Sequence, residues 1–180
     1  LAAAFAARGV GHGSVVALLL PSTPFYLVAY LAAARLGAVT AGINARYRRT
    51  EIGHILRASG ATLLVAVETW HDADFRAAVE LLRADLPELH DVIWIAGEQL
   101  RTSTRDAVSA LTVTTTAAPP ASVAPDDPVT IVFTSGTTGI PKGAWYTHRN
   151  ILALAEIDTR RYAGGVIPFQ KHLAAGLSFA

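Results

Sequence analysis

Four short, largely apolar runs, separated by segments of helical pattern, occupy the first half of the chain. They are Ser14–Leu20, Ala38–Ile43, Ala61–Val67 and Asp91–Ala96. Continuous apolar runs of this length are typical of strands that are covered on both faces, as in parallel sheets. The order is therefore β-α-β-α-β-α-β. Because parallel neighbours need a crossover between them, this order predicts an α/β fold with a mostly parallel sheet flanked by helices, a three-layer αβα arrangement.

Helices are predicted between these runs. They extend from Pro24 to Leu36, from Thr50 to Gly60 and from Asp72 to Pro87. Gly37 is expected to close the first helix, because glycine accepts the left-handed conformation common at helix ends. Asp72 is expected to cap the third helix with its carboxylate.

Composition excludes several classes of protein. Of 180 residues, 52% are hydrophobic and 16% charged, which excludes an intrinsically disordered chain. A net charge of +1 gives no strong positive potential that would attract nucleic acid, so no nucleic-acid partner is expected. The most apolar stretch, residues 25–43, is interrupted by Arg35 and Gly37, and we interpret it as a buried helix and strand rather than a transmembrane segment.

Two residue types are missing from the sequence. There is no cysteine, which excludes a disulfide framework and a thiolate metal site. This absence is compatible with a reducing compartment, and we expect a cytoplasmic protein. Methionine is also absent, even at position 1, so we expect the chain to be a piece of a longer one.

Residues 98–128 differ in composition from what precedes them. They are rich in Thr, Ala, Ser and Pro, and the sequence predicts a linker-like connection with one short strand at Leu111–Thr115. A buried strand resumes at Val129–Phe133, and a helix is expected from Thr147 to Arg161.

A glycine- and hydroxyl-rich loop follows the strand at Val129–Phe133. It contains three glycines, four hydroxyl side chains and one lysine: Gly136, Gly139, Gly143, Thr134, Ser135, Thr137, Thr138 and Lys142. Glycines let a backbone adopt positive φ and turn successive N–H groups into one concavity, while hydroxyls and a lysine suit phosphate oxygens. The loop lies at the carboxyl end of a strand, where α/β proteins bind ligands. These residues predict a polyphosphate-binding loop.

This loop is not a Walker A motif. That motif places Gly-Lys-Ser/Thr after four residues, whereas here Pro141 precedes Lys142 and Gly143 follows it. A P-loop kinase or GTPase is excluded on that spacing.

The segment Thr134-Ser-Gly-Thr-Thr-Gly-Ile-Pro-Lys-Gly143, followed by Thr147-His-Arg-Asn150, resembles the signature of the adenylate-forming superfamily. That superfamily holds the acyl-CoA synthetases, the luciferases and the adenylation domains of peptide synthetases. Segments 6–21 and 37–51 resemble the same family's N-terminal lobe. The resemblance implies that residues 1–180 are a partial N-terminal AMP-binding domain. Its expected parts are 1–97 (βα units), 98–128 (connection), 129–163 (strand, phosphate loop and helix) and 164–180 (start of the next segment).

The resemblance implies an acid–thiol ligase that forms AMP. A carboxylic acid would attack the α-phosphate of Mg-ATP to give an acyl-adenylate and pyrophosphate, and CoA would then displace AMP. Carried over by position, the residues that would bind the ATP phosphates are Thr134, Ser135, Gly136, Thr137, Thr138, Gly139 and Lys142. ATP, Mg²⁺ and CoA are the implied cofactors and cosubstrates, and fatty acid metabolism is the expected setting.

The main catalytic lysine of this family and its magnesium-binding glutamate would lie beyond Ala180, so no metal ligand is expected in this chain. The fragment alone is expected to be inactive. For His148 a structural role beside the loop is expected, for His172 a surface position, and for Trp145 and Tyr146 packing against the sheet.

Alternatives remain at this point. The chain could belong to an adenylation domain that loads a carrier protein, to a luciferase-like oxidase, or to a non-catalytic nucleotide-binding module. The sequence does not identify the acid, the acceptor or the oligomeric state.

Overall fold

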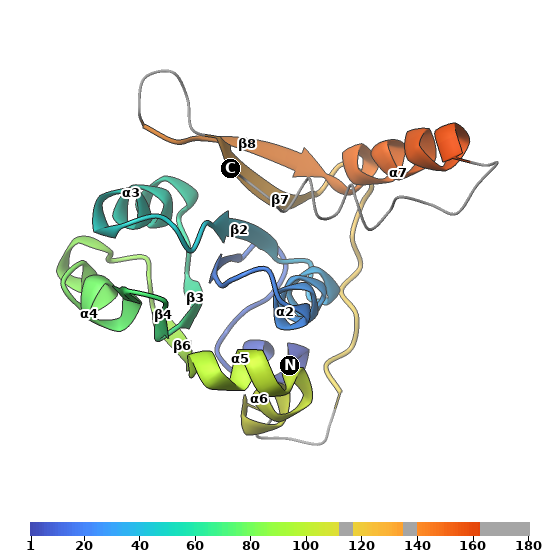
Figure 1. The fold of residues 1–180 in the computed structure, drawn as a ribbon. Helices are drawn as coiled ribbons and strands as arrows, with labels where there is room; N and C mark the ends of the chain where they lie inside the picture. The colour runs from blue at the N-terminus through green and yellow to red at the C-terminus, as the bar shows by residue number, and fades with distance from the viewer. Residues whose placement is uncertain (112–116, 135–139, 163–180) are drawn as a thin grey trace.

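A computed structural model describes residues 1–111, 117–134 and 140–162. Its main feature is a six-stranded sheet in the order β6-β3-β1-β2-β7-β8 (Figure 1). The strands are β1 (Val15–Leu19), β2 (Val39–Ile43), β3 (Leu63–Val67), β6 (Asp91–Ile95), β7 (Pro128–Thr134) and β8 (Lys142–Thr147). Strands β6, β3, β1, β2 and β7 run parallel to one another. Only β8, within this described sheet, is antiparallel to its neighbour β7, so the predicted mostly parallel sheet is confirmed.

Helices cover both faces of this sheet. They are α1 (Ala2–Ala6), α2 (Pro24–Arg35), α3 (Arg49–Ser59), α4 (Phe75–Glu80), α5 (Gly97–Thr102), α6 (Thr104–Leu111) and α7 (His148–Tyr162). Helices α3 and α4 lie on one side, and α2, α5 and α6 lie on the other (Figure 1). The three-layer αβα arrangement is therefore confirmed.

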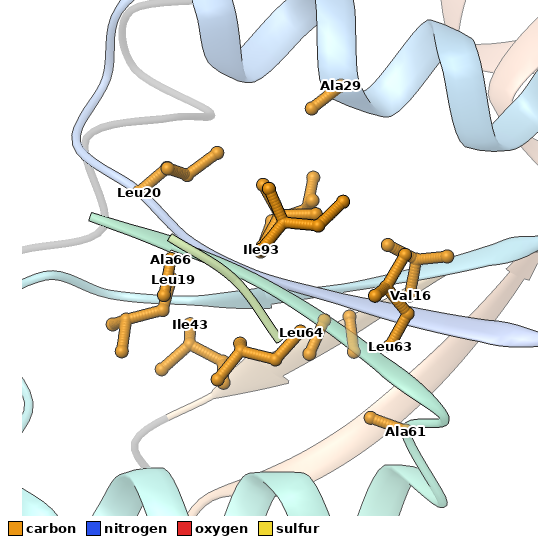
Figure 2. Packing of buried hydrophobic residues seen from close by; sticks show 14 of the residues in the cluster. Val16, Leu19, Leu20, Ala29, Ile43, Ala61, Leu63, Leu64, Ala66 and Ile93 are labelled. Carbon is orange, nitrogen blue, oxygen red and sulfur yellow. The ribbon is translucent and has the colours of Figure 1, made fainter. Parts of the chain in front are cut away.

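The core lies on both sides of β1 and β3, in which every residue is buried. Figure 2 shows Ala29 of α2 above the sheet, and Ile43 and Leu64 below it on the side of α3. This two-sided burial explains why these strands appear in the sequence as unbroken apolar runs instead of alternating ones.

The segment after β3 differs from the prediction. Strands β4 (Thr69–Trp70) and β5 (Ala73–Asp74) form a small hairpin, so Asp72 lies in its turn and caps no helix. Asp74 is the cap instead, since its Oδ1 accepts a hydrogen bond from the Ala77 N–H at 2.9 Å. The predicted long helix is a short α4 followed by the 3₁₀ turn η1 (Arg83–Asp85).

Residues 97–111 form the two helices α5 and α6, which the sequence did not predict. The buried side chains of Leu100 and Ala107 attach them to the core. Leu111, expected to begin the strand Leu111–Thr115, is instead the last residue of α6. The other residues of that expected strand lie outside the described part of the chain. Farther on, Arg35 Nε donates to the Ala118 oxygen at 2.9 Å and ties this segment to the end of α2.

Helix α7 is the longest helix among the described residues, and it extends away from the sheet beyond β8 (Figure 1). Its start at His148 lies within one residue of the predicted start. No helix in residues 1–111, 117–134 and 140–162 combines the length and the apolar character that crossing a membrane requires.

Candidate functional site

The predicted phosphate loop leaves the sheet between β7 and β8. Thr134, the last residue of β7, pairs with Lys142, the first residue of β8, and both side chains are exposed. The structure therefore brings together the first and last of the predicted phosphate-binding residues. The others lie outside the described residues: Ser135, Gly136, Thr137, Thr138 and Gly139.

Thr134 is at the carboxyl end of a strand that is parallel to β2. Carboxyl ends of parallel strands meet at one edge of a sheet, where open α/β folds bind ligands. The antiparallel return through β8 fixes the base of the loop at this edge. The sequence did not predict β8, because Lys142–Thr147 is mostly exposed and lacks a clear apolar alternation.

Gly143 serves a different purpose from the one predicted. The prediction assigned it a positive φ, but Gly143 is not among the glycines that have one. It is instead a β8 residue at which a Cβ atom would lie 2.9 Å from Ile131 Cγ2 and 3.0 Å from Phe133 Cζ. Glycine lets β8 run this close to the β7 side chains, which a larger residue would force to shift.

Helix α3 contacts the end of the loop through His54. Its Nε2 lies 2.8 Å from the main-chain oxygen of Pro141, the residue before Lys142. The sequence alone does not indicate His54, because a single histidine on an otherwise amphipathic helix carries no motif. Only the tertiary arrangement places it beside a segment 87 residues away.

The Thr147–Asn150 part of the signature forms a helix cap. The Thr147 N–H donates to Asn150 Oδ1 at 2.9 Å, and the Asn150 N–H donates to Thr147 Oγ1 at 3.2 Å. This reciprocal pair satisfies main-chain groups at the start of α7. His148 follows β8 at the end opposite Lys142, roughly 20 Å along the strand at about 3.3 Å per residue. Its structural role beside the loop stays a prediction. His172 lies outside the described residues.

The β8–α7 junction carries an open, largely apolar groove of about 340 Å³. It is lined by Trp145, Tyr146, Asn150, Ala153, Leu154 and Ile157. Trp145 is 55% exposed, which differs from its predicted packing against the sheet. Across the described ranges, no three His, Cys, Asp or Glu side chains come together as a metal site would require.

Comparisons with known proteins agree with this arrangement of the sheet and its helices. The family model of the AMP-binding enzymes matches residues 1–174. A Mycobacterium tuberculosis ligase that joins CoA to a methyl-dioxo-octahydroindenyl propanoyl group is 39% identical over 84% of this chain and 30% of its own length. The 4-coumarate–CoA ligase of Pinus taeda is 33% identical over 85% of this chain and 27% of its own. The long-chain-fatty-acid–CoA ligase FadD13 of Mycobacterium tuberculosis is 31% identical over 94% of this chain and 33% of its own.

A solved structure shares the fold as well. The anthranilate CoA ligase AuaEII, crystallised with anthranoyl-AMP, superimposes with a TM-score of 0.70 at 27% identity, over 86% of this chain and 28% of that one. The chain thus spans about a third or less of the proteins that it resembles. With a family model that covers nearly its whole length, the chain belongs to the AMP-binding enzyme family.

Proposed function

We propose that this chain is the phosphate-binding part of an AMP-forming acid–thiol ligase, which activates a carboxylic acid with ATP and transfers it to CoA. The observation that carries the proposal is the pairing of Thr134 with Lys142 at the base of the signature loop. Family membership and CoA-ligase relatives support it. Residues 1–180 would form a partial N-terminal AMP-binding domain, with parts 1–97, 98–128, 129–163 and 164–180.

The first half-reaction breaks the bond between the α- and β-phosphates of ATP. A carboxylate oxygen attacks the α-phosphorus, which gives an acyl-adenylate, and pyrophosphate leaves with the electron pair of the broken bond. Negative charge grows on the leaving oxygen in the transition state. Lys142 would provide a positive charge there, and hydroxyl and N–H groups of residues 134–139 would donate hydrogen bonds to the β- and γ-phosphate oxygens.

The second half-reaction forms the thioester. The CoA sulfur attacks the acyl carbon and AMP leaves, while the thiol proton passes to a base or to water. No residue of this chain is assigned to that step. No Mg²⁺ ligands are assigned within the described residues either. A Mg²⁺ ion bound with ATP would neutralise phosphate charge.

The acids of the relatives suggest a substrate class. Their names specify a fused-ring propanoic acid, an aromatic acid and a long-chain fatty acid, each a carboxylate on a largely apolar body. We therefore propose an acid of this kind, with fatty acid metabolism as one setting. The partners would be the acid, ATP and CoA, and a cytoplasmic location would give access to both cosubstrates.

The test is acid-dependent pyrophosphate release by the full-length protein that carries these residues, with Mg-ATP, CoA and a panel of fatty, aromatic and short acids. Lys142→Ala should lower the rate at subsaturating ATP, since a charged hydrogen bond contributes about 1.5–3 kcal/mol, roughly ten- to hundredfold. Gly136→Val should also lower it. Arg105→Ala is the matched control, because Arg105 is an exposed cation on α6, a helix well separated from β7 and β8 (Figure 1).

Two outcomes would contradict the proposal. ATP binding without pyrophosphate release for any acid would favour a non-catalytic nucleotide-binding module. Acyl transfer to a carrier protein but not to CoA would identify a carrier-loading adenylation domain. The 180-residue chain alone is expected to complete neither half-reaction.

A further inference from the structure

We infer that His54 is a positioning residue for Lys142: its imidazole holds the peptide unit between Pro141 and Lys142 so that the lysine points at the nucleotide phosphates. The inference rests on the proposed function of the loop. It concerns a side chain on α3, far outside the signature motif, and assigns it a part in ATP binding.

The hydrogen bond fixes one peptide plane. His54 Nε2 lies 2.8 Å from the Pro141 carbonyl oxygen, and because a carbonyl only accepts, Nε2 carries the proton and donates. That carbonyl belongs to the same planar unit as the Lys142 N–H. Holding the oxygen therefore sets the direction of the Lys142 N–H and the point from which its side chain departs.

Pro141 makes this restraint more effective. Its ring fixes φ near −65°, which leaves ψ as the free rotation before Lys142. The hydrogen bond from His54 removes that freedom, and Pro141 itself is buried. The exit of the loop is thus restrained at both rotations of one residue.

Helix α3 holds His54 firmly. Ile52 and Ile55 on either side of it in the sequence are fully buried. A Cβ atom at Gly53 would lie 2.9 Å from Leu82 Cδ2, so α3 packs closely against the segment between α4 and η1. Glu51 accepts from the Arg48 N–H at 3.2 Å at the start of the helix. A rigid helix can impose its geometry on the loop, whereas a mobile one could not.

Lys142 needs such support because its side chain is long and exposed. A lysine loses considerable rotamer freedom when it binds a phosphate. A backbone that is already fixed reduces the further conformational entropy that is lost on binding. The expected effect of His54 is therefore on ATP binding, not on the affinity for the acid.

The experiment compares two substitutions in the full-length protein. His54→Phe keeps a ring of similar size but has no donor, while His54→Gln keeps an N–H donor at similar reach. His54→Phe should raise the KM for ATP about three- to tenfold, the effect of losing one hydrogen bond, and leave the KM for the acid within about twofold. His54→Gln should restore most of the ATP affinity. His90→Phe, at an exposed histidine before β6, is the control.

A double-mutant cycle tests the route through Lys142. If His54 acts by positioning that lysine, His54→Phe should add little to the ATP defect of Lys142→Ala. Additive effects would overturn the inference. So would equal defects in the Phe and Gln variants accompanied by equal losses in melting temperature, since that pattern indicates packing alone.

The failures of the two proposals can be told apart. If the protein binds ATP but releases no pyrophosphate, the proposed ligase function fails, and the Kd for ATP in the same variants still decides the role of His54. If the wild-type protein does not bind ATP, both fail. A change confined to the KM for the acid overturns the His54 inference and leaves the ligase function standing.

Discussion

Thr40 on β2 and Thr130 on β7 face each other across the junction between the main sheet and the loop-bearing hairpin. Their Oγ1 atoms lie 3.1 Å apart, and the Thr130 hydroxyl donates to the Thr40 main-chain oxygen at 3.2 Å. In the described part of the chain, the ladder between β2 and β7 consists of two residue pairs, and this is one of them. The two side chains therefore secure the strand that delivers the phosphate loop.

Thr40→Val should destabilise the chain by about 1 kcal/mol, because it removes a hydroxyl that is buried and hydrogen-bonded. Thr130→Val should cost a similar amount. Combined, they should cost less than the sum, since both remove the same interaction. Urea unfolding measures the three values, with Thr102→Val, at an exposed residue of α5, as control. Strict additivity would show that the two hydroxyls act independently.

Gly143→Ala should destabilise the β7–β8 hairpin by about 1–3 kcal/mol through overpacking against Ile131 and Phe133. Gly11→Ala is the matched control, because a Cβ atom there meets nothing within 4 Å. Thermal unfolding of both variants checks the difference. Equal melting temperatures would mean that β8 moves away from β7 at no cost.

Leu64→Ala should destabilise the chain by about 3 kcal/mol, since Leu64 is fully buried in β3 and its removal leaves a cavity. Leu81→Ala should change stability by no more than about 0.5 kcal/mol, because Leu81 is 68% exposed. Urea unfolding of the two alanine variants gives the comparison. A small loss at Leu64 would contradict the tight two-sided packing of the sheet.

Tyr26 should make the free energy of unfolding depend on pH in the alkaline range. Burial, and secondly the nearby Tyr30, raise the pKa of Tyr26 to about 12, whereas an unfolded tyrosine titrates near 10. Between these values the unfolded chain releases the proton and the folded chain keeps it, so stability should fall as pH rises from about 10 to about 12. Tyr26→Phe should flatten that fall, measured as urea midpoints against pH.

Tyr47→Phe is the comparison for this titration, since Tyr47 lies in the loop between β2 and α3 and is only half-buried. The same slope in all three proteins would mean that another group controls the alkaline loss of stability.

The centre of the sheet could be predicted because every residue of β1 and β3 is buried, on both faces of the sheet. Short runs such as Ala61–Val67 favour strands when segments of helical pattern separate them. The misses have separate physical causes. Strand β8 is exposed, so burial leaves no pattern in its sequence. Helices α5 and α6 are short, and each is attached to the core by a single buried residue. Asp72 was predicted as the helix cap in place of Asp74, which lies two residues later and has the same side chain.

The candidate site could be predicted where residue type alone indicates the chemistry, as at Lys142. His54 could not, because its relation to Pro141 arises only when α3 folds against the hairpin. Gly143 was identified for the wrong reason. The sequence does not distinguish a glycine that is needed for a positive φ from one that is needed because neighbouring side chains pack close to its Cα. Sequence reasoning identified the residues of the loop but not the side chains that hold it.

The strand order has a consequence during synthesis. β1, β2, β3 and β6 pair among themselves, so most of the sheet can assemble before β7 leaves the ribosome. β2 ends at Ile43 and its outer neighbour begins at Pro128, so at 5–20 residues per second β2 remains an open edge for on the order of ten seconds. An unpaired, apolar strand is a template for other chains. Translation that pauses between these two strands should therefore yield aggregated nascent protein, and the arrival of β7 ends that risk.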